Sequence, residues 1–158
     1  MSAIKVEGLE DGVQKLGAIL LDKFSKTSID RALRLATSQT RTDIKKRVFN
    51  EQGATLEDGT SAGRYSEEYF LRREELYGRT NRNINFIATD SMSRAFQFER
   101  KAYNQYVLGL NEVGNKTDTT NANKYKYLSD RFGNFLSLSQ QEITNFYKVF
   151  TTELFKKR

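Results

Sequence analysis

Apolar side chains recur at helical spacing close to the C-terminal end of this chain. Four of them follow one another at intervals of four, three and four residues: Ile143, Tyr147, Phe150 and Leu154. This spacing places them on one face of an α-helix. Ser139 and Glu142 precede it, and the side chain of each can bond the backbone amide of the other at a helix start. The pattern predicts a helix from 140 to about 156, preceded by a short strand or extended segment at 132–138.

The N-terminal half carries two longer apolar stripes. The first repeats at four, three, four and four residues: Leu9, Val13, Leu16, Leu20 and Phe24. The second also has helical spacing: Ile29, Leu33, Ala36, Ile44 and Val48. Thr27 or Ser28 can cap the second helix, which would run to about residue 49. We expect a long pair of helices at 9–24 and 28–49, preceded by a short strand at 3–8.

The middle of the chain predicts one helix and a hairpin between two polar loops. Residues 50–64 are rich in Gly, Ser, Thr and Asp, which is typical of a long loop. A helix at 67–77 would be capped by Ser66 and ended by Gly78. Alternating apolar residues predict a strand at 84–88, and the β-prone runs 95–101 and 105–110 predict a hairpin. Residues 111–123 are polar and rich in turn-forming residues, so we expect a second loop there.

These elements predict a single α+β domain spanning residues 1–158. In it, a long N-terminal helical pair packs on a small, mostly antiparallel sheet, and a C-terminal helix closes the core. The 158 residues suffice for one domain with its own core. Eleven Phe and eight Tyr make the chain too aromatic for a disordered protein, although only 37% of its residues are hydrophobic.

The chain contains neither cysteine nor histidine. Disulfides, thiolate metal sites and every imidazole-based catalytic or metal site are therefore excluded. A two-metal nuclease site needs only carboxylates, and the candidates for one are Glu67, Glu68, Glu74, Glu75 and Asp90. The alternative is ordinary helix electrostatics, which we favour because no Asp-x-Asp or Glu-x-Lys pattern accompanies them. We expect no enzyme activity, no metal and no cofactor.

Nothing in the sequence suggests insertion into a membrane. No stretch approaches the ~20 apolar residues of a membrane span. Residues 1–12 have neither the basic start nor the apolar core of a signal peptide. We expect a soluble protein made in the cytoplasm, without a membrane partner.

The net charge of +6 draws attention to clustered basic residues. Four of them fall within about 80° of one another on a helical wheel: Arg31, Arg34, Arg41 and Lys45. This basic stripe predicts either a surface for DNA or an acidic partner, or simply a solvated helix face. Arg79 and Arg82 lie in the segment 78–83, which we expect to be a turn. The alternative is that these two arginines contact phosphate.

Aromatic residues supply a second set of candidates. Tyr125 and Tyr127 stand among Lys124, Lys126 and Arg131. This composition is found in platforms for single-stranded nucleic acids and also in subunit interfaces. Phe155 lies in the terminal segment 153–158, which we expect to be free to meet a neighbouring chain.

Taken in order, several segments resemble one known family. They are "GRYSEEYFLRR", "IATDSMSRAF", a hairpin ending in "YVLGL", a variable loop, and "FLSLSQQEI". Their order is similar to that in the phage virion-morphogenesis and tail-completion family. Residues 89–92 would correspond to that family's Thr-Gly-Asp-Met/Leu turn, and 136–139 to its Phe-Leu-Gly-Leu-Ser segment. Asp90 and Ser137 stand where the family usually has glycine, and the likeness covers about residues 49–154.

The resemblance implies a structural protein of a tailed-phage virion. Members of the family act at the head–tail joint or at the tail end, so the implied role is tail completion or head–tail joining as a ring or collar. Its implied partners are further copies of itself, neighbouring connector, portal-side or tail-tube proteins, and passing DNA without sequence specificity. It would be made in the host bacterial cytoplasm and reside in the virion. The alternative is a basic nucleic-acid-binding module, which the charge and the basic stripe support.

Overall fold

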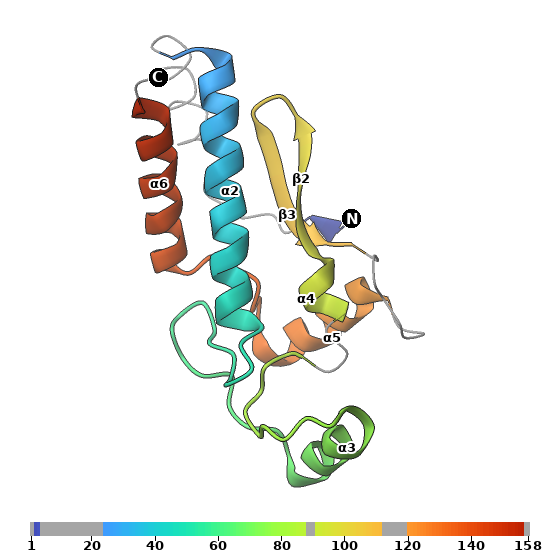
Figure 1. The fold of residues 1–158 in the computed structure, drawn as a ribbon. Helices are drawn as coiled ribbons and strands as arrows, with labels where there is room; N and C mark the ends of the chain where they lie inside the picture. Colours follow the sequence, from blue (N-terminus) through green and yellow to red (C-terminus); the bar gives the residue numbers. More distant parts are fainter. Residues whose placement is uncertain (1, 4–23, 88–90, 112–119, 157–158) are drawn as a thin grey trace.

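The computed structural model describes residues 2–3, 24–87, 91–111 and 120–156, and it shows a mixed architecture of helices and antiparallel strands (Figure 1). The elements follow in chain order: β1 (Ser2–Ala3), α2 (Lys26–Val48), α3 (Glu67–Tyr77), α4 (Ser91–Ala95), β2 (Phe96–Ala102), β3 (Gln105–Leu110), α5 (Asn121–Phe132) and α6 (Gln140–Phe155). The predicted helix at 9–24 lies outside the described residues except for Phe24, as does most of the predicted strand at 3–8.

The long helical pair in the structure is made by α2 and α6. The two helices run antiparallel and side by side along one edge of the molecule (Figure 1). Their contact buries a small cluster: Ile29, Ala32, Ala36, Phe150 and Leu154. The two fully buried alanines let the helix backbones approach closely. Helix α2 is capped by Ser25, whose side chain accepts a bond from the Ser28 amide, so the predicted cap was two to three residues late.

Helix α6 confirms the prediction of a capping box. The Ser139 hydroxyl accepts a bond from the Glu142 amide at 3.2 Å, and a Glu142 carboxylate oxygen accepts one from the Ser139 amide at 2.8 Å. Phe150 and Leu154 of the predicted stripe are buried, and Phe146 beside it packs in the cluster between the helices, whereas Tyr147 remains 39% exposed. The apolar stripe alone could not show that Glu142 is itself buried.

The predicted hairpin is confirmed as β2 and β3. Strand β1 pairs antiparallel with the edge of β3 that faces away from β2, which gives the order β1-β3-β2. Asn104 in its turn has φ +59°, a left-handed conformation that asparagine tolerates. The turn is tied to α2, because the Asn104 amide donates to Asp30 at 3.0 Å and the Arg100 guanidinium lies 3.2 Å from the same carboxylate. Figure 1 shows the hairpin standing beside α2, on the side away from α6.

The main core lies at the lower end of α2, below the hairpin. It joins the end of α2, the segment 84–87, α4, the start of the hairpin and the turn before α6. The short strand or extended segment predicted at 132–138 is wrong: Phe132 is the last residue of α5, and Phe135 and Leu136 are buried in a tight turn at 133–138. The partly buried Arg47 side chain holds that turn by donating to the backbone oxygens of Phe135 and Ser137.

Two further predictions about the middle of the chain were wrong. Residues 84–87 form no strand, because four consecutive side chains are buried and Phe86 adopts φ +50°, which breaks the alternation of a strand. Helix α5 was not predicted at all, and it takes residues 121–123 from the expected loop. Thr120 caps it, and the fully buried Asn121 donates to the backbone oxygen of Asn111. Residues 112–119 lie outside the described part of the chain.

Candidate functional site

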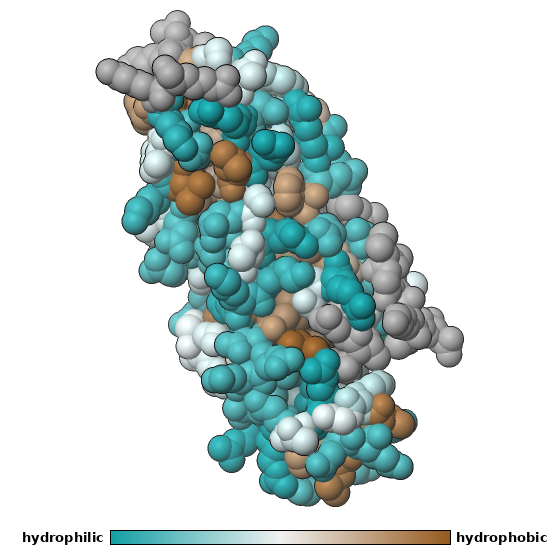
Figure 2. Space-filling model, viewed as in Figure 1, coloured by the Kyte–Doolittle hydropathy of each residue, from teal (hydrophilic) through white to brown (hydrophobic). Residues whose placement is uncertain are grey.

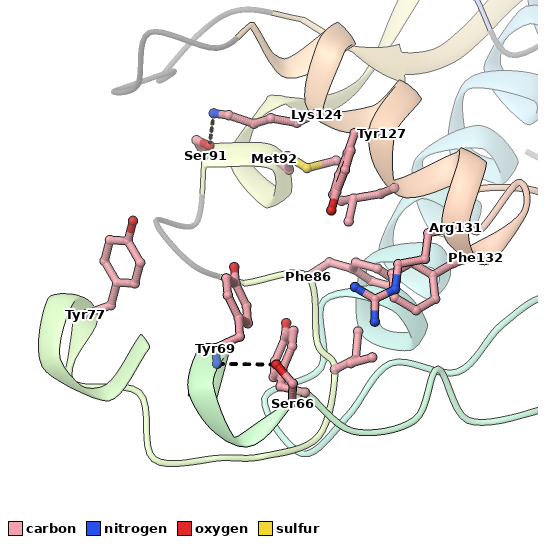
Figure 3. A pocket seen from close by; sticks show the side chains of 13 residues that line it. Ser66, Tyr69, Tyr77, Phe86, Ser91, Met92, Lys124, Tyr127, Arg131 and Phe132 are labelled. Atoms are coloured by element: carbon pink, nitrogen blue, oxygen red, sulfur yellow. Dashed lines mark hydrogen bonds between the residues drawn. The ribbon is translucent and has the colours of Figure 1, made fainter. Parts of the chain in front are cut away.

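A cleft of about 500 Å³ opens between α3, α4 and α5 (Figure 3). Tyr69 and Tyr77 of α3 line one side, and Tyr127 of α5 lines the other. The rings of Phe86 and Phe132 meet edge to face at 5.3 Å in the lining. Six of the thirteen lining residues are aromatic, and a concave site of this volume is of the size that binds a small ligand or a large side chain of a partner.

Helix α3 has the ends that the sequence predicts. The Ser66 hydroxyl accepts a bond from the Tyr69 amide at 3.4 Å, shown dashed in Figure 3. Gly78 ends the helix with φ +62°, and its amide bonds back to the carbonyl of Glu74. The Gly78 conformation is left-handed, which glycine adopts without steric cost.

A buried arginine fixes α3 to the rest of the molecule. Arg73 is only 1% exposed and donates to the Ile87 carbonyl at 2.6 Å and to the Asn85 side chain at 3.0 Å. Its guanidinium also lies 4.1 Å from the centre of the Tyr65 ring. Sequence reasoning missed this residue, although its position three residues after the buried Phe70 places it on the same helix face. One wall of the cleft is thus attached largely through polar contacts.

The charge in the cleft lining is positive. Among the described residues, Lys124 and Arg131 are the charged residues of the lining, and no carboxylate belongs to it. Lys124 donates to Ser91 at 3.1 Å and to Asn121 at 3.4 Å. The guanidinium of Arg131 lies 5.1 Å from the centre of the Phe132 ring, and Figure 3 shows it turned into the cleft. Within the described residues Arg131 forms no ion pair, so the cleft offers a cation beside aromatic rings.

Partial burial raises the pKa of Tyr69 above its ordinary value, and the neighbouring Tyr65 adds to the effect. The two tyrosine rings lie 5.1 Å apart. The Tyr69 hydroxyl therefore stays neutral at physiological pH and can donate a hydrogen bond to an occupant of the cleft.

Helix α3 exposes several large hydrophobic side chains among its charged ones. Of the nine large hydrophobic side chains that are exposed among the described residues, four belong to this helix: Tyr69, Leu71, Leu76 and Tyr77. Leu71 is 54% exposed and Leu76 56%. Figure 2 shows hydrophobic side chains gathered over α3 at the lower end of the molecule. Figure 1 shows α3 standing apart from the α2–α6 pair.

The structure does not bring the predicted basic stripe together as one open surface. Arg31 donates to the backbone oxygen of Glu153 in α6 at 2.9 Å, whereas Arg41 donates to that of Phe96 in β2 at 2.8 Å. Arg34 is exposed and Lys45 is partly buried. Two of the four side chains thus brace α2 against different neighbours, which weakens the case for a nucleic-acid surface here.

The other predicted basic residues pair with acidic ones. Arg79 lies 3.3 Å from Glu51, and Arg82 lies 2.6 Å from Glu67 while its guanidinium sits 4.8 Å from the centre of the Phe70 ring. These contacts join the segment after α3 to its surroundings, so both arginines have structural partners.

The predicted aromatic candidates separate into different environments. The Tyr125 hydroxyl bonds the Asn134 side chain, and its ring packs on Phe135 in the core. Tyr127 is 67% exposed at the cleft. Phe155 is 66% exposed, far from the cleft, and meets Phe24 edge to face at 5.0 Å. Tyr127 alone of these three lines the cleft.

Among the residues that the structure describes, no three acidic residues lie close enough to hold a metal ion. Asp90, one of the carboxylates considered, lies outside them. No helix in the described ranges is long and apolar enough to cross a bilayer. Comparison with known proteins leaves the family open, since no protein-family model, curated protein or solved structure matches this chain.

Proposed function

We propose that this chain is a structural protein of a tailed-phage virion that acts in tail completion or head–tail joining. It would form a ring or collar at the neck or tail end, in contact with connector, portal-side or tail-tube proteins. The order of the segments that resemble the tail-completion family supports this setting. The protein works by binding other chains and carries out no chemistry.

The observation that carries the assembly role is helix α3. A short helix with two leucines and two tyrosines exposed beside an aromatic cleft has the composition of a protein interface, in which tyrosine is enriched. Single exposed apolar side chains are normal on a protein surface, but Tyr69, Leu76 and Tyr77 lie within about 100° of one another around the axis of α3 and form a patch, while Leu71 is exposed on the opposite side.

Two measurements test the proposal. Mass spectrometry of purified virions should find the chain in the particle, and electron microscopy of particles carrying a tagged copy should place it at the neck or tail end. A phage without the gene should make DNA-filled heads and separate tails but few joined particles. Normal infectivity of the deletion strain, or absence of the chain from the virion, would refute the role.

A further inference from the structure

Helix α3 carries one leucine surrounded by all four of its glutamates. Leu71 is exposed, and its neighbours at three and four residues in both directions are Glu67, Glu68, Glu74 and Glu75. Residues at these spacings lie beside one another on a helix surface. Each glutamate therefore falls within about 60° of Leu71 around the helix axis. We call Leu71 with these four glutamates the acidic leucine face.

The charge of this face is largely available to a partner. Glu67 pairs with Arg82 at 2.6 Å, and both side chains are more than half exposed. Glu68, Glu74 and Glu75 form no ion pair within the described residues. Three carboxylates thus surround an exposed apolar side chain, a combination that fits an apolar site with a positively charged rim.

The cleft between α3, α4 and α5 is such a site. Aromatic rings line it, and Arg131 turns its guanidinium into it (Figure 3). In the part of the chain that the structure describes, this guanidinium forms no ion pair and no carboxylate belongs to the lining. The apolar lining and the positive charge therefore complement the acidic leucine face: an apolar side chain can enter among the rings while a glutamate meets Arg131.

The two surfaces point in different directions on one chain. Tyr69 lines the cleft, and Leu71 lies about 160° from it around the helix axis. A chain cannot insert Leu71 into its own cleft, but it can offer Leu71 to one neighbour while its cleft receives the Leu71 of another. Contacts of this head-to-tail kind build rings when the rotation closes.

We infer that a second copy of this chain occupies the cleft, with its acidic leucine face inserted so that Leu71 packs among Tyr69, Tyr127 and Phe132. Glu74 or Glu75 of the inserted helix pairs with Arg131. The inference rests on the proposed assembly function and names its interface. It is a heterologous contact, in which each copy uses two different surfaces.

Sedimentation velocity of the purified full chain, at concentrations from about 1 µM to 1 mM, tests the contact. The wild-type chain should self-associate, and the association should weaken at 1 M salt because the paired charges are screened. Leu71→Ser should raise the dissociation constant roughly tenfold or more. Leu35→Ser is the control, since it removes an exposed leucine on α2, outside both the cleft and the acidic leucine face.

A mixing experiment separates the head-to-tail contact from a symmetric one. Leu71→Ser removes the apolar side chain of the acidic leucine face, and Arg131→Glu reverses the charge in the cleft. Each variant alone should therefore be mainly monomeric. An equimolar mixture retains one intact interface per pair and should form dimers but nothing larger. Both substitutions are at exposed positions, and circular dichroism checks that each variant is folded.

Three results would overturn the inference: a monomeric wild-type chain over the whole range, equal loss of association in the two leucine variants, or a mixture that stays monomeric. These outcomes are distinct from failure of the proposed function. A chain found in the virion but monomeric in solution refutes this interface alone. A chain that associates through Leu71 but is absent from virions refutes the phage role alone.

Discussion

Replacing Arg47 by methionine should destabilise the protein far more than removing an exposed ion pair. The Arg47 side chain is 12% exposed and that of Glu142 is 5% exposed. Two of the guanidinium nitrogens meet the two carboxylate oxygens of Glu142, at 2.8 and 3.2 Å. The same guanidinium donates to the backbone oxygens of Thr55, Phe135 and Ser137. One side chain thus joins α2, the loop after it and the turn that leads into α6.

The magnitude follows from what the substitution leaves behind. Methionine fills much of the space, but Glu142 remains buried without its counter-charge and keeps only the bond from the Ser139 amide. Breaking a buried pair from one side costs about 3–5 kcal/mol, and the three carbonyls also lose their donor. Since domains are stable by about 5–15 kcal/mol, the loss is a large part of the total. Lys101→Met, which breaks the half-exposed pair with Glu99, should cost no more than about 1 kcal/mol.

Urea unfolding followed by circular dichroism measures both variants, with the midpoint reporting stability and the slope checking that the same surface is exposed. Arg47→Lys provides a second variant if the methionine form does not fold. Lysine keeps the positive charge but cannot donate in parallel to both carboxylate oxygens of Glu142 as the planar guanidinium does. The stability of Arg47→Lys should therefore lie between those of Arg47→Met and Lys101→Met. If Arg47→Met proved no more destabilising than Lys101→Met, the bonds of Arg47 would not be what holds the turn before α6.

Three other outcomes are expected. Loss of water raises the pKa of Asp30, but the Asn104 amide and the Arg100 charge more than offset this and lower it. Asp30→Asn should therefore destabilise at pH 7; the difference from wild type should begin to shrink below about pH 4, where Asp30 of the unfolded chain is protonated, and be lost only below the lowered pKa of the folded state. A constant difference in acid unfolding would contradict this. Gly78→Ala should cost about 1 kcal/mol, measured by urea unfolding, because residue 78 has a left-handed backbone conformation that alanine adopts only with strain. An added Cβ meets no neighbouring atom there, so no steric clash adds to this cost. The purified protein should cleave neither DNA nor peptide with Mg²⁺ or Mn²⁺ in gel assays, and metal-dependent cleavage lost in Glu67→Gln would show otherwise.

Elements whose signals are local could be predicted from the sequence. The capping box at Ser139, the Ser66 and Gly78 ends of α3, and the β2–β3 hairpin all depend on residues a few positions apart. Helix α5 was missed because its composition is polar, although Tyr125, Leu128 and Phe132 follow at three and four residues and pack on the core.

What could not be predicted depends on contacts distant in the sequence. Arg72 and Arg73 are adjacent and chemically identical, yet Arg72 is exposed and Arg73 is buried beneath the segment at 85–87. Likewise, Arg31 and Arg41 belong to one stripe on α2, but α6 and β2 approach that stripe from different directions and supply the carbonyls that each side chain binds. A helical wheel gives the direction of a side chain but does not identify the groups of other elements that pack against it.

Helix α3 is suited to an intermolecular contact because few of its apolar side chains meet a partner within the chain. Of its apolar and aromatic side chains only Phe70 is buried, and its main attachment is the polar network of Arg73. Fully burying a leucine-sized side chain is worth about 1.5–3 kcal/mol, and Leu71 and Leu76 each leave more than half of that unrealised in the single chain. The helix therefore does not depend on these leucines for its own position, and covering them with another protein is the remaining source of hydrophobic stabilisation. A surface of this kind can form a contact on assembly without first having to unfold anything.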